Sequence, residues 1–454
     1  MSDSSALNRP WYQRIGPGLI TACVVIGPGS ILTSSKVGAN DGYSKLWIVI
    51  ASVAFMLVYM TLGAKLGAVA ETSPGNLIRK KAGQWLAVMV GCCVFFISAA
   101  FQSGNNLGVA AAFTAFTKSE TVVTVLVILF NLLAITFLFA FKNLYRVLER
   151  LMMFLVALML ISFAINLIVL RPDLGDLLMG FIPFAQSTDS ATTTTEGLDG
   201  LISLLGLIGT TFVITAAFYQ SYLVRQKGWD SSQVKSGIMD ARVGAVIMAL
   251  ITVMLVSTAA AGLYDGSYIK LTDPIQVADE LEPTFGTRGK YIFSLGLFSA
   301  AFSSFLVNSM IGGFIVSDCL GFGSEPHDKA PRIMTTVALL TGMVVAVCVL
   351  QLKFDIAPTI IAAQAVTVVG APLIAAVLLW LASSKDVMGT HAARPATLIF
   401  AGFGLAVLIA IAANTAINTV PTKIRNYLNK NTEENTEKQP AEADAPSPAG
   451  PTTD

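Results

Sequence analysis

The sequence has little charge. Only 13% of its 454 residues are Asp, Glu, Lys or Arg, whereas soluble globular proteins carry about 25%. Hydrophobic residues make up 54%. This composition excludes an ordinary soluble enzyme, and it excludes disordered and nucleic-acid-binding chains, which are polar or basic. The 29 basic and 28 acidic residues leave a formal net charge of +1, so the overall charge of the chain does not identify a partner.

Histidine and cysteine are also scarce. The two histidines, His327 and His391, fall in predicted loops, so no histidine relay is expected within the membrane. The five cysteines lie in apolar stretches without metal-ligand or disulfide-framework spacing, which predicts small core residues. No Gly-rich phosphate loop and no Ser/His or His/Glu/Asp set is present. We therefore expect neither an enzyme nor a bound cofactor.

Long apolar segments dominate the chain. A membrane-spanning helix needs about 20 apolar residues, and continuous runs exclude the alternating pattern of barrel strands. The N-terminus lacks the order of charged, apolar and cleavage regions that a signal peptide has. Eleven spans are predicted, near 15–38, 45–70, 84–116, 121–141, 147–170, 199–224, 236–262, 290–316, 333–352, 358–383 and 396–417.

Loop charges predict the orientation. With the N-terminus in the cytoplasm, the cytoplasmic loops hold about twice as many Lys and Arg residues as the outer loops, as the positive-inside rule requires. We expect a cytoplasmic segment (1–14), a transmembrane domain (15–418) and a polar, largely disordered tail (419–454). Eleven spans then place the C-terminus outside. The expected location is a bacterial inner (plasma) membrane, and the two longest outer loops are expected near 171–198 and 263–289.

The first span contains Gly27-Pro28-Gly29-Ser30 at its middle. Proline removes a backbone donor and glycine permits non-helical angles. Two interpretations remain open on this pattern: a simple kink, or a discontinuous helix whose free backbone groups bind a substrate. The sixth span, which would be its counterpart in a second five-helix repeat, contains Gly209, Thr210, Thr211 and Thr215, a weaker signal for a break.

Several segments resemble one family, in the order and at the spacing that the family shows. They are GPGLITA in the first span, LIGTTFVITAAFYQSYLVRQKGW in the sixth, FSLGLFSAAFSSFLVNSMIGGFIVSDCLG in the eighth and IIAAQAVTVVGAPLIAAVLLWLASSKDVMG in the tenth. The chain resembles the natural resistance-associated macrophage protein (Nramp) family of divalent-metal transporters over nearly all of residues 15–390. The resemblance implies an all-α membrane protein with a LeuT-like five-plus-five inverted repeat, in which helices 1 and 6 are unwound.

The family's metal-binding residues are mostly replaced in this chain. The family uses Asp and Asn on helix 1, a Met and a nearby carbonyl on helix 6, and often a Gln on helix 10. The resemblance places Gly27 and Ser30 at the Asp and Asn positions, Val213 at the Met, Thr210 at the carbonyl and Gln364 at the Gln.

The family's titratable positions are replaced as well. Thr215 and Gln220 stand where the family has histidines, and Gln102 and Asn105 where helix 3 carries two acidic residues implicated in proton movement. Transport, if it occurs, is therefore expected to show little proton coupling. Lys36, six residues after Ser30, is either a lysine that reaches the outer interface or a fixed cation that would repel cations from the outer vestibule.

The predicted substrate site is thus a set of neutral oxygens around Gly27, Ser30, Thr210, Thr211, Val213, Thr215 and Gln364, of which Ser30 and Gln364 are the candidate metal ligands. We predict breaks at Gly27–Ser30 and within Thr210–Ala216, and we expect Ser30 and Gln364 to face each other. Without carboxylate and thioether, the site could hold a partly hydrated hard cation weakly or a monovalent ion, and it also fits a neutral solute.

The sequence favours a secondary transporter of an inorganic, divalent metal cation by alternating access. The alternatives are the same fold carrying a small organic solute or an anion, or a non-transporting membrane sensor. Expected partners are the substrate and the lipid bilayer, with no nucleic acid, and the sequence defines no oligomeric state.

Overall fold

The computed structural model describes residues 16–141, 143–183, 204–269, 271, 274–353, 357–422 and 424–425. Every regular element within these ranges is a helix. The helices are α1 (Pro17–Val25), α2 (Pro28–Asp41), α3 (Leu46–Val69), α4 (Pro74–Thr114), α5 (Glu120–Ala140), α6 (Leu144–Leu170), α7 (Leu174–Met179), α9 (Ile214–Gln226), η2 (Ser231–Gln233), α10 (Val234–Leu263), α11 (Pro274–Leu320), α12 (Lys329–Leu352), α13 (Ala357–Ser383), α14 (Lys385–Met388), η3 (Gly389–His391), α15 (Pro395–Asn414) and η4 (Thr415–Thr419).

Nine helices in the described residues are long and apolar enough to cross a membrane, or up to eleven spans if each of two bent helix pairs is counted as one. The bent pairs are α1 with α2, at 61°, and the last part of α13 with α14 and η3, at 62°. Each of the eleven predicted segments coincides with one of these spans. The predicted all-α membrane fold is therefore confirmed.

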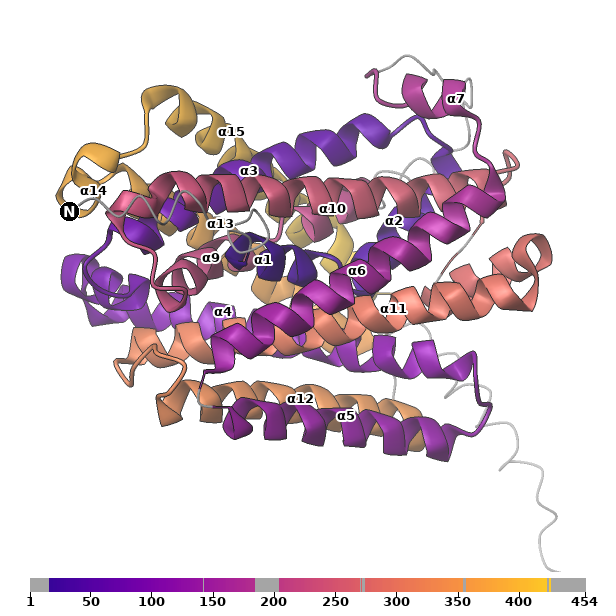
Figure 1. The fold of residues 1–454 in the computed structure, drawn as a ribbon, viewed down its shortest axis with the longest axis horizontal. Coiled ribbons are helices and arrows are strands. Elements are labelled where there is room, and N and C mark those ends of the chain that lie inside the picture. Colours follow the sequence, from indigo (N-terminus) through magenta and orange to yellow (C-terminus); the bar gives the residue numbers. More distant parts are fainter. Residues whose placement is uncertain are drawn as a thin grey trace, which may run out of the picture.

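The short helix α1 lies at the centre of the molecule, with α10 and α6 passing beside it, whereas α5 and α12 lie side by side at one edge (Figure 1). All nine residues of α1 are buried. Two glycines allow α1 to approach α10 closely, because a Cβ atom at Gly244 would lie only 2.3 Å from the carbonyl oxygen of Gly18. Small residues commonly allow such contacts between membrane helices.

Two helices begin earlier than the sequence predicts. Helix α4 begins at Pro74 rather than near 84, and α11 begins at Pro274, inside the predicted outer loop 263–289. Each bends at a glycine with positive φ, Gly83 (89°) and Gly286 (68°). Apolar runs mark only the part of a helix that fits the bilayer, so the polar first turns escaped detection.

The connection predicted near 171–198 contains the short helix α7. Residues 184–198 of this connection lie outside the described ranges. At the other end of the chain, the last span continues to Thr422. Most of the predicted polar tail, 426–454, also lies outside what the structure describes.

Candidate functional site

The first span is broken where α1 meets α2. Ile26 (φ −91°, ψ 81°) and Gly27 (φ −113°, ψ −177°) leave the helical conformation, and Pro28 opens α2. The predicted interruption at Gly27–Ser30 is thus present, but it begins one residue earlier, and Pro28 to Ser30 are already helical. The reason is that proline is well suited to the first turn of a helix, where its missing N–H costs nothing.

The break frees carbonyl oxygens at the end of α1, and serine hydroxyls meet them. The Ser30 hydroxyl donates to the carbonyl of Val25 at 2.7 Å. From α11, the Ser304 hydroxyl donates to Val24 at 3.2 Å and the Ser303 hydroxyl lies 3.5 Å from the carbonyl of Cys23. Ser30, a predicted metal ligand, therefore caps α1 with its hydroxyl proton, although its oxygen retains lone pairs that could accept a ligand.

The second break lies in the sixth span. Residues 204–211 are helical, Val213 is not (φ −83°, ψ 90°), and α9 resumes at Ile214. This interruption falls within the predicted range Thr210–Ala216. The Thr210 hydroxyl bonds to the carbonyl of Gly206 and, at 2.9 Å, to the hydroxyl of Thr33 in α2. The two broken spans therefore meet at Thr33 and Thr210, whereas Thr211 and Thr215 are buried beside the break.

The two predicted coupling residues of α4 also lie at this junction. The Gln102 amide donates to the backbone carbonyl of Phe305 in α11 at 3.1 Å, and the Asn105 amide lies 3.4 Å from the Gln102 oxygen. A Cβ atom at Gly27 would lie 3.5 Å from the Asn105 oxygen and 3.0 Å from the Ser304 hydroxyl. Asn105 and Ser304 therefore border the space that a longer side chain at position 27 would need.

Gln364 lies in α13, but its side chain is outside the described residues. Its predicted position opposite Ser30 therefore stays a prediction.

Sequence reasoning missed the contribution of α11, which is far away in the chain. Ser303 and Ser304 are adjacent hydroxyl residues in an apolar span, and that pair is the signal that could have identified them. It also missed two carboxylates in the spans, Asp240 and Asp318, both nearly inaccessible to solvent. Acidic residues are costly in hydrocarbon, so a carboxylate in an apolar run deserves a functional hypothesis.

Asp240 of α10 holds the start of α1. Its carboxylate accepts the backbone N–H groups of Gly16 at 2.7 Å and Gly18 at 2.5 Å. The Thr21 hydroxyl, one turn along α1, hydrogen-bonds to the side-chain amide of Gln220 in α9. Gln220 stands where the family resemblance expects a histidine, and here it anchors α1 instead.

Asp318 of α11 has the same role at the start of α4. It accepts the Gly75 N–H at 2.7 Å and the hydroxyls of Ser73 and Tyr222 at 2.5 and 2.7 Å. Each carboxylate thus satisfies N–H groups that a helix start leaves without intrahelical partners, where the helix dipole also favours negative charge.

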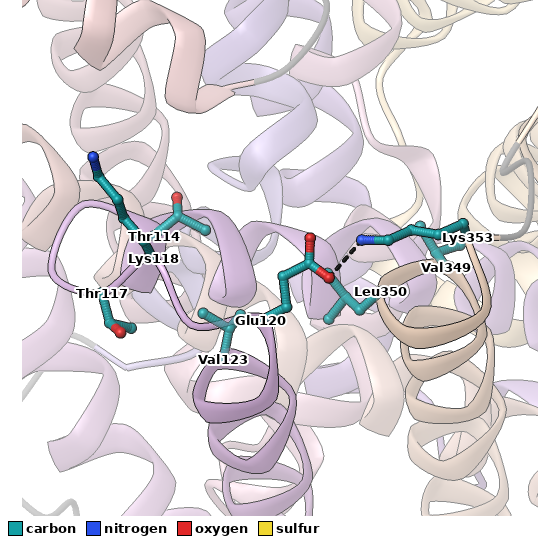
Figure 2. A pocket seen from close by; sticks show the side chains of 8 residues that line it. All are labelled: Thr114, Thr117, Lys118, Glu120, Val123, Val349, Leu350 and Lys353. Carbon is teal, nitrogen blue, oxygen red and sulfur yellow. Dashed lines mark hydrogen bonds and ion pairs between the residues drawn. The ribbon is translucent and has the colours of Figure 1, made fainter.

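A surface hollow of about 410 Å³ lies between the end of α4, the start of α5 and the end of α12 (Figure 2). Its main polar feature is an ion pair between Lys353 and Glu120 at 2.6 Å, with both side chains more than 60% exposed. Exposed pairs of this kind contribute about 0–1 kcal/mol. None of the predicted site residues lines this hollow, so we do not assign the substrate site to it.

The donors at the junction are neutral. In the described part of the chain, no three His, Cys, Asp or Glu side chains come together as metal ligands. The groups that do converge are hydroxyls, amides and backbone carbonyls from α1, α2, α4, α11 and the sixth span. Oxygen donors of this type suit hard cations, and they do not favour soft transition metals.

Comparison with known proteins identifies the family. The chain is 25% identical over 404 residues to a divalent metal cation transporter MntH of Deinococcus radiodurans, covering 87% of both chains, and 23% identical over 419 residues to one of Verminephrobacter eiseniae, covering 89% of both. The crystal structure of a manganese transporter of Eremococcus coleocola has the same fold (TM-score 0.76, 18% identity, 94% of this chain and 90% of that chain covered). The crystal structure of MhsT in complex with L-phenylalanine also has this fold, with lower similarity (TM-score 0.57, 15% identity, 88% of this chain and 98% of that chain covered). The model of the natural resistance-associated macrophage protein-like family matches residues 18–418, and the chain therefore belongs to the Nramp family of multi-pass membrane proteins.

Proposed function

We propose that this protein is a secondary transporter that moves a divalent metal cation across the membrane by alternating access. The observation that supports this most directly is the meeting of two broken spans, α1–α2 and 204–226, at one group of polar side chains. Discontinuous helices present free backbone groups at mid-membrane, where they bind ions and substrates. The relatives' names, which describe divalent metal cation transporters, agree with this function.

The donor chemistry indicates which cation is carried. Ser30, Thr210 and Asn105 supply neutral oxygens, while Gly27 and Val213 offer neither carboxylate nor thioether. A divalent cation bound by such groups would keep several of its water molecules, as Mg²⁺ commonly does. We therefore infer a hard cation of the Mg²⁺ or Mn²⁺ type, bound weakly. The polar midplane argues against a non-transporting sensor.

The substrate approaches from the α2 side. Gly29 of α2 and Gly209 of the sixth span are exposed, and no heavy atom from outside the neighbouring residues and backbone of its own helix lies within 4 Å of the Cβ position at either residue. By contrast, α1 is buried along its whole length. We propose that the N-terminus is cytoplasmic, on the loop-charge asymmetry, so that this conformation opens to the outside. Bacterial relatives support an inner-membrane location.

Uptake by the purified protein in liposomes tests the function. The parent should accumulate Mg²⁺ or Mn²⁺ above the level of empty liposomes, and Ser30→Ala should reduce that uptake because an oxygen at the junction is lost. Ser52→Ala is the matched control, since the Ser52 hydroxyl is buried like that of Ser30 and bonds to the Ile48 carbonyl of its own helix α3. A parent that transports none of Mg²⁺, Mn²⁺ and Ca²⁺ would refute the proposal.

A further inference from the structure

The hollow between α4, α5 and α12 lies where three spans end. The residues that line it come from 114–123 and 349–353, at the ends of the candidate spans Pro74–Thr114 and Lys329–Leu352 and at the start of Glu120–Ala140. In a bilayer, the ends of spans lie at the level of the lipid headgroups. A volume of about 410 Å³ is in the range of sites for small ligands. The position and the size of the hollow therefore suit a headgroup.

The charged side chains of the hollow carry a net positive charge. Lys118 and Lys353 lie on opposite sides of Glu120 (Figure 2). Glu120 pairs with Lys353, whereas no acidic side chain in the described part of the chain forms an ion pair with Lys118. Two lysines and one glutamate leave one positive charge uncompensated. A ligand with a single negative charge, such as one phosphodiester group, neutralises the lining.

Two threonine hydroxyls lie on the same side of the hollow as Lys118 (Figure 2). The Thr117 hydroxyl accepts the backbone N–H of Ser119 at 3.2 Å, so its own proton remains available to a ligand oxygen. The Thr114 hydroxyl donates to the Ala111 carbonyl at 2.7 Å, and its oxygen remains available as an acceptor. This side therefore offers donors for phosphate oxygens and an acceptor for a hydroxyl group of the headgroup.

An apolar face of α5 begins at the level of the hollow. Val122, Val125, Leu129 and Leu132 are 46–58% exposed, and they are three or four residues apart, so they lie along one side of the helix. Helix α5 lies at an edge of the molecule beside α12 (Figure 1), and in a membrane this face packs against acyl chains. A headgroup in the hollow is thus continuous with chains along α5, which favours a phospholipid over a free phosphate ion.

We propose that the hollow between α4, α5 and α12 binds the headgroup of an anionic phospholipid. Lys118 and Thr117 donate to its phosphodiester group from one side. Lys353 donates from the other side, since an ammonium group has three donors and can hold Glu120 as well. The bound lipid bridges the end of α4 to the end of α12 and stabilises their packing on the start of α5. This site does not depend on the proposed transport of a divalent cation.

Native mass spectrometry of the purified full-length protein measures the binding. The parent should retain one molecule of dioleoyl phosphatidylglycerol more strongly than dioleoyl phosphatidylcholine, which has the same chains and no net charge. Its melting temperature in detergent should rise with the first lipid and not with the second. Lys118→Gln should weaken phosphatidylglycerol binding about fivefold, the effect of one lysine near an anionic membrane surface. Lys118→Arg should preserve the binding, because the charge is kept.

Arg171→Gln is the matched control. Arg171 is an exposed cation at the end of α6, in the same left-handed conformation as Lys353 at the end of α12 (φ 51° and 54°), but it does not line the hollow. Removing its charge should leave phosphatidylglycerol binding unchanged. A loss as large as that in Lys118→Gln would mean that the lipid responds to the overall surface charge, and the specific site would be refuted.

Glu120→Gln should have the opposite effect. This change removes the negative charge of the lining and releases the Lys353 ammonium group, so phosphatidylglycerol binding should tighten by about the same factor of five. An ion pair that serves only to hold α5 to α12 would instead give a lower melting temperature and no gain in lipid affinity. That result would overturn the role assigned to these two residues.

Two further outcomes contradict the proposal. Equal binding of the two lipids by the parent overturns the site, and so does an unchanged affinity for phosphatidylglycerol in both Lys118→Gln and Lys353→Gln. Water-soluble glycerol phosphate separates a lipid from a free phosphate, and it should neither raise the melting temperature nor displace phosphatidylglycerol. If it does both, the hollow binds a soluble phosphate, and the assignment to a phospholipid is wrong.

Discussion

The two halves of the broken first helix are held in opposite ways. Helix α1 is buried throughout, Asp240 holds its first N–H groups, and serine hydroxyls meet its last carbonyls. Helix α2 leaves Gly29 exposed, and a Thr33–Thr210 hydrogen bond joins it to the other broken span. In this structure α1 is therefore enclosed along its whole length, whereas Gly29 at the start of α2 is exposed.

This difference identifies which bonds must break during transport. Alternating access requires the α1 side to open while the α2 side closes. Opening would separate α1 from α10 and α11. Helix α1 is joined to α10 by the Asp240 carboxylate and by the close packing of Gly18 on Gly244, and to α11 by Ser303 and Ser304. The α1 side should therefore resist opening more. A change at the start of α1 and a change in α2 test that expectation, and a third change tests the junction between them.

Asp240→Asn should have the largest effect. Its amide oxygen can accept only one of the two N–H groups well, because the amide nitrogen is a donor and would oppose the other. An orphaned buried N–H costs about 1–3 kcal/mol. Cys23, buried in α1, reports the release of this helix when the other four cysteines are replaced by serine. We expect its labelling by a small maleimide to accelerate at least tenfold.

Asp318→Asn is the matched control for this experiment. Asp318 accepts comparable bonds at the start of α4, not α1. The Asp318→Asn variant should lower the melting temperature in detergent as Asp240→Asn does, but the rate of Cys23 labelling should change little. Equal acceleration in both variants would mean that Cys23 reports general loosening, and the special role of Asp240 would be lost.

Much of the fold was predictable from the sequence, and less of the site. The lengths of the apolar runs predict the eleven spans, and Pro28 between two glycines predicts the first break. Both signals are contained in a short stretch of sequence. The contacts of Asp240 with Gly16 and of Ser304 with Val24 join residues more than 200 positions apart. No local pattern encodes such pairs. The family resemblance identifies the positions at which ligands are substituted, Gly27 and Val213. It does not identify residues outside the family's motif.

The junction between the halves gives the second prediction. Gly27→Asp with Val213→Met restores a carboxylate and a thioether, so the double variant should bind Mn²⁺ about tenfold more tightly than the parent, which corresponds to about 1.4 kcal/mol. The new Cβ at position 27 would meet the Ser304 hydroxyl at 3.0 Å, and that serine must move away from Val24. Calorimetric titration of Mn²⁺ into the parent, both single variants and the double variant measures the gain.

The single variants separate two effects in this series. Val213→Met adds volume to a partly buried position, and overpacking costs about 1–3 kcal/mol, so melting temperatures must accompany the titrations. A folded double variant that binds Mn²⁺ no better than the parent would show that the pocket no longer places ligands at these two positions. The cation would then have to bind elsewhere at the junction.

The α2 side gives the smallest expected effect. Thr33→Val removes the hydroxyl that bonds to Thr210 and keeps the shape of the side chain, while the Thr210 hydroxyl retains the Gly206 carbonyl as a partner. The loss should be about 0.5–1.5 kcal/mol. Gly29→Cys in a cysteine-free background should react readily with a membrane-impermeant thiol reagent, and Thr33→Val should raise its rate by about twofold to tenfold. Thr136→Val, which removes a hydroxyl bonded within α5, should leave the rate unchanged. If Gly29→Cys does not react at all without the Thr33 change, the α2 side is closed in solution, and the contrast between the two half-helices does not describe the resting protein.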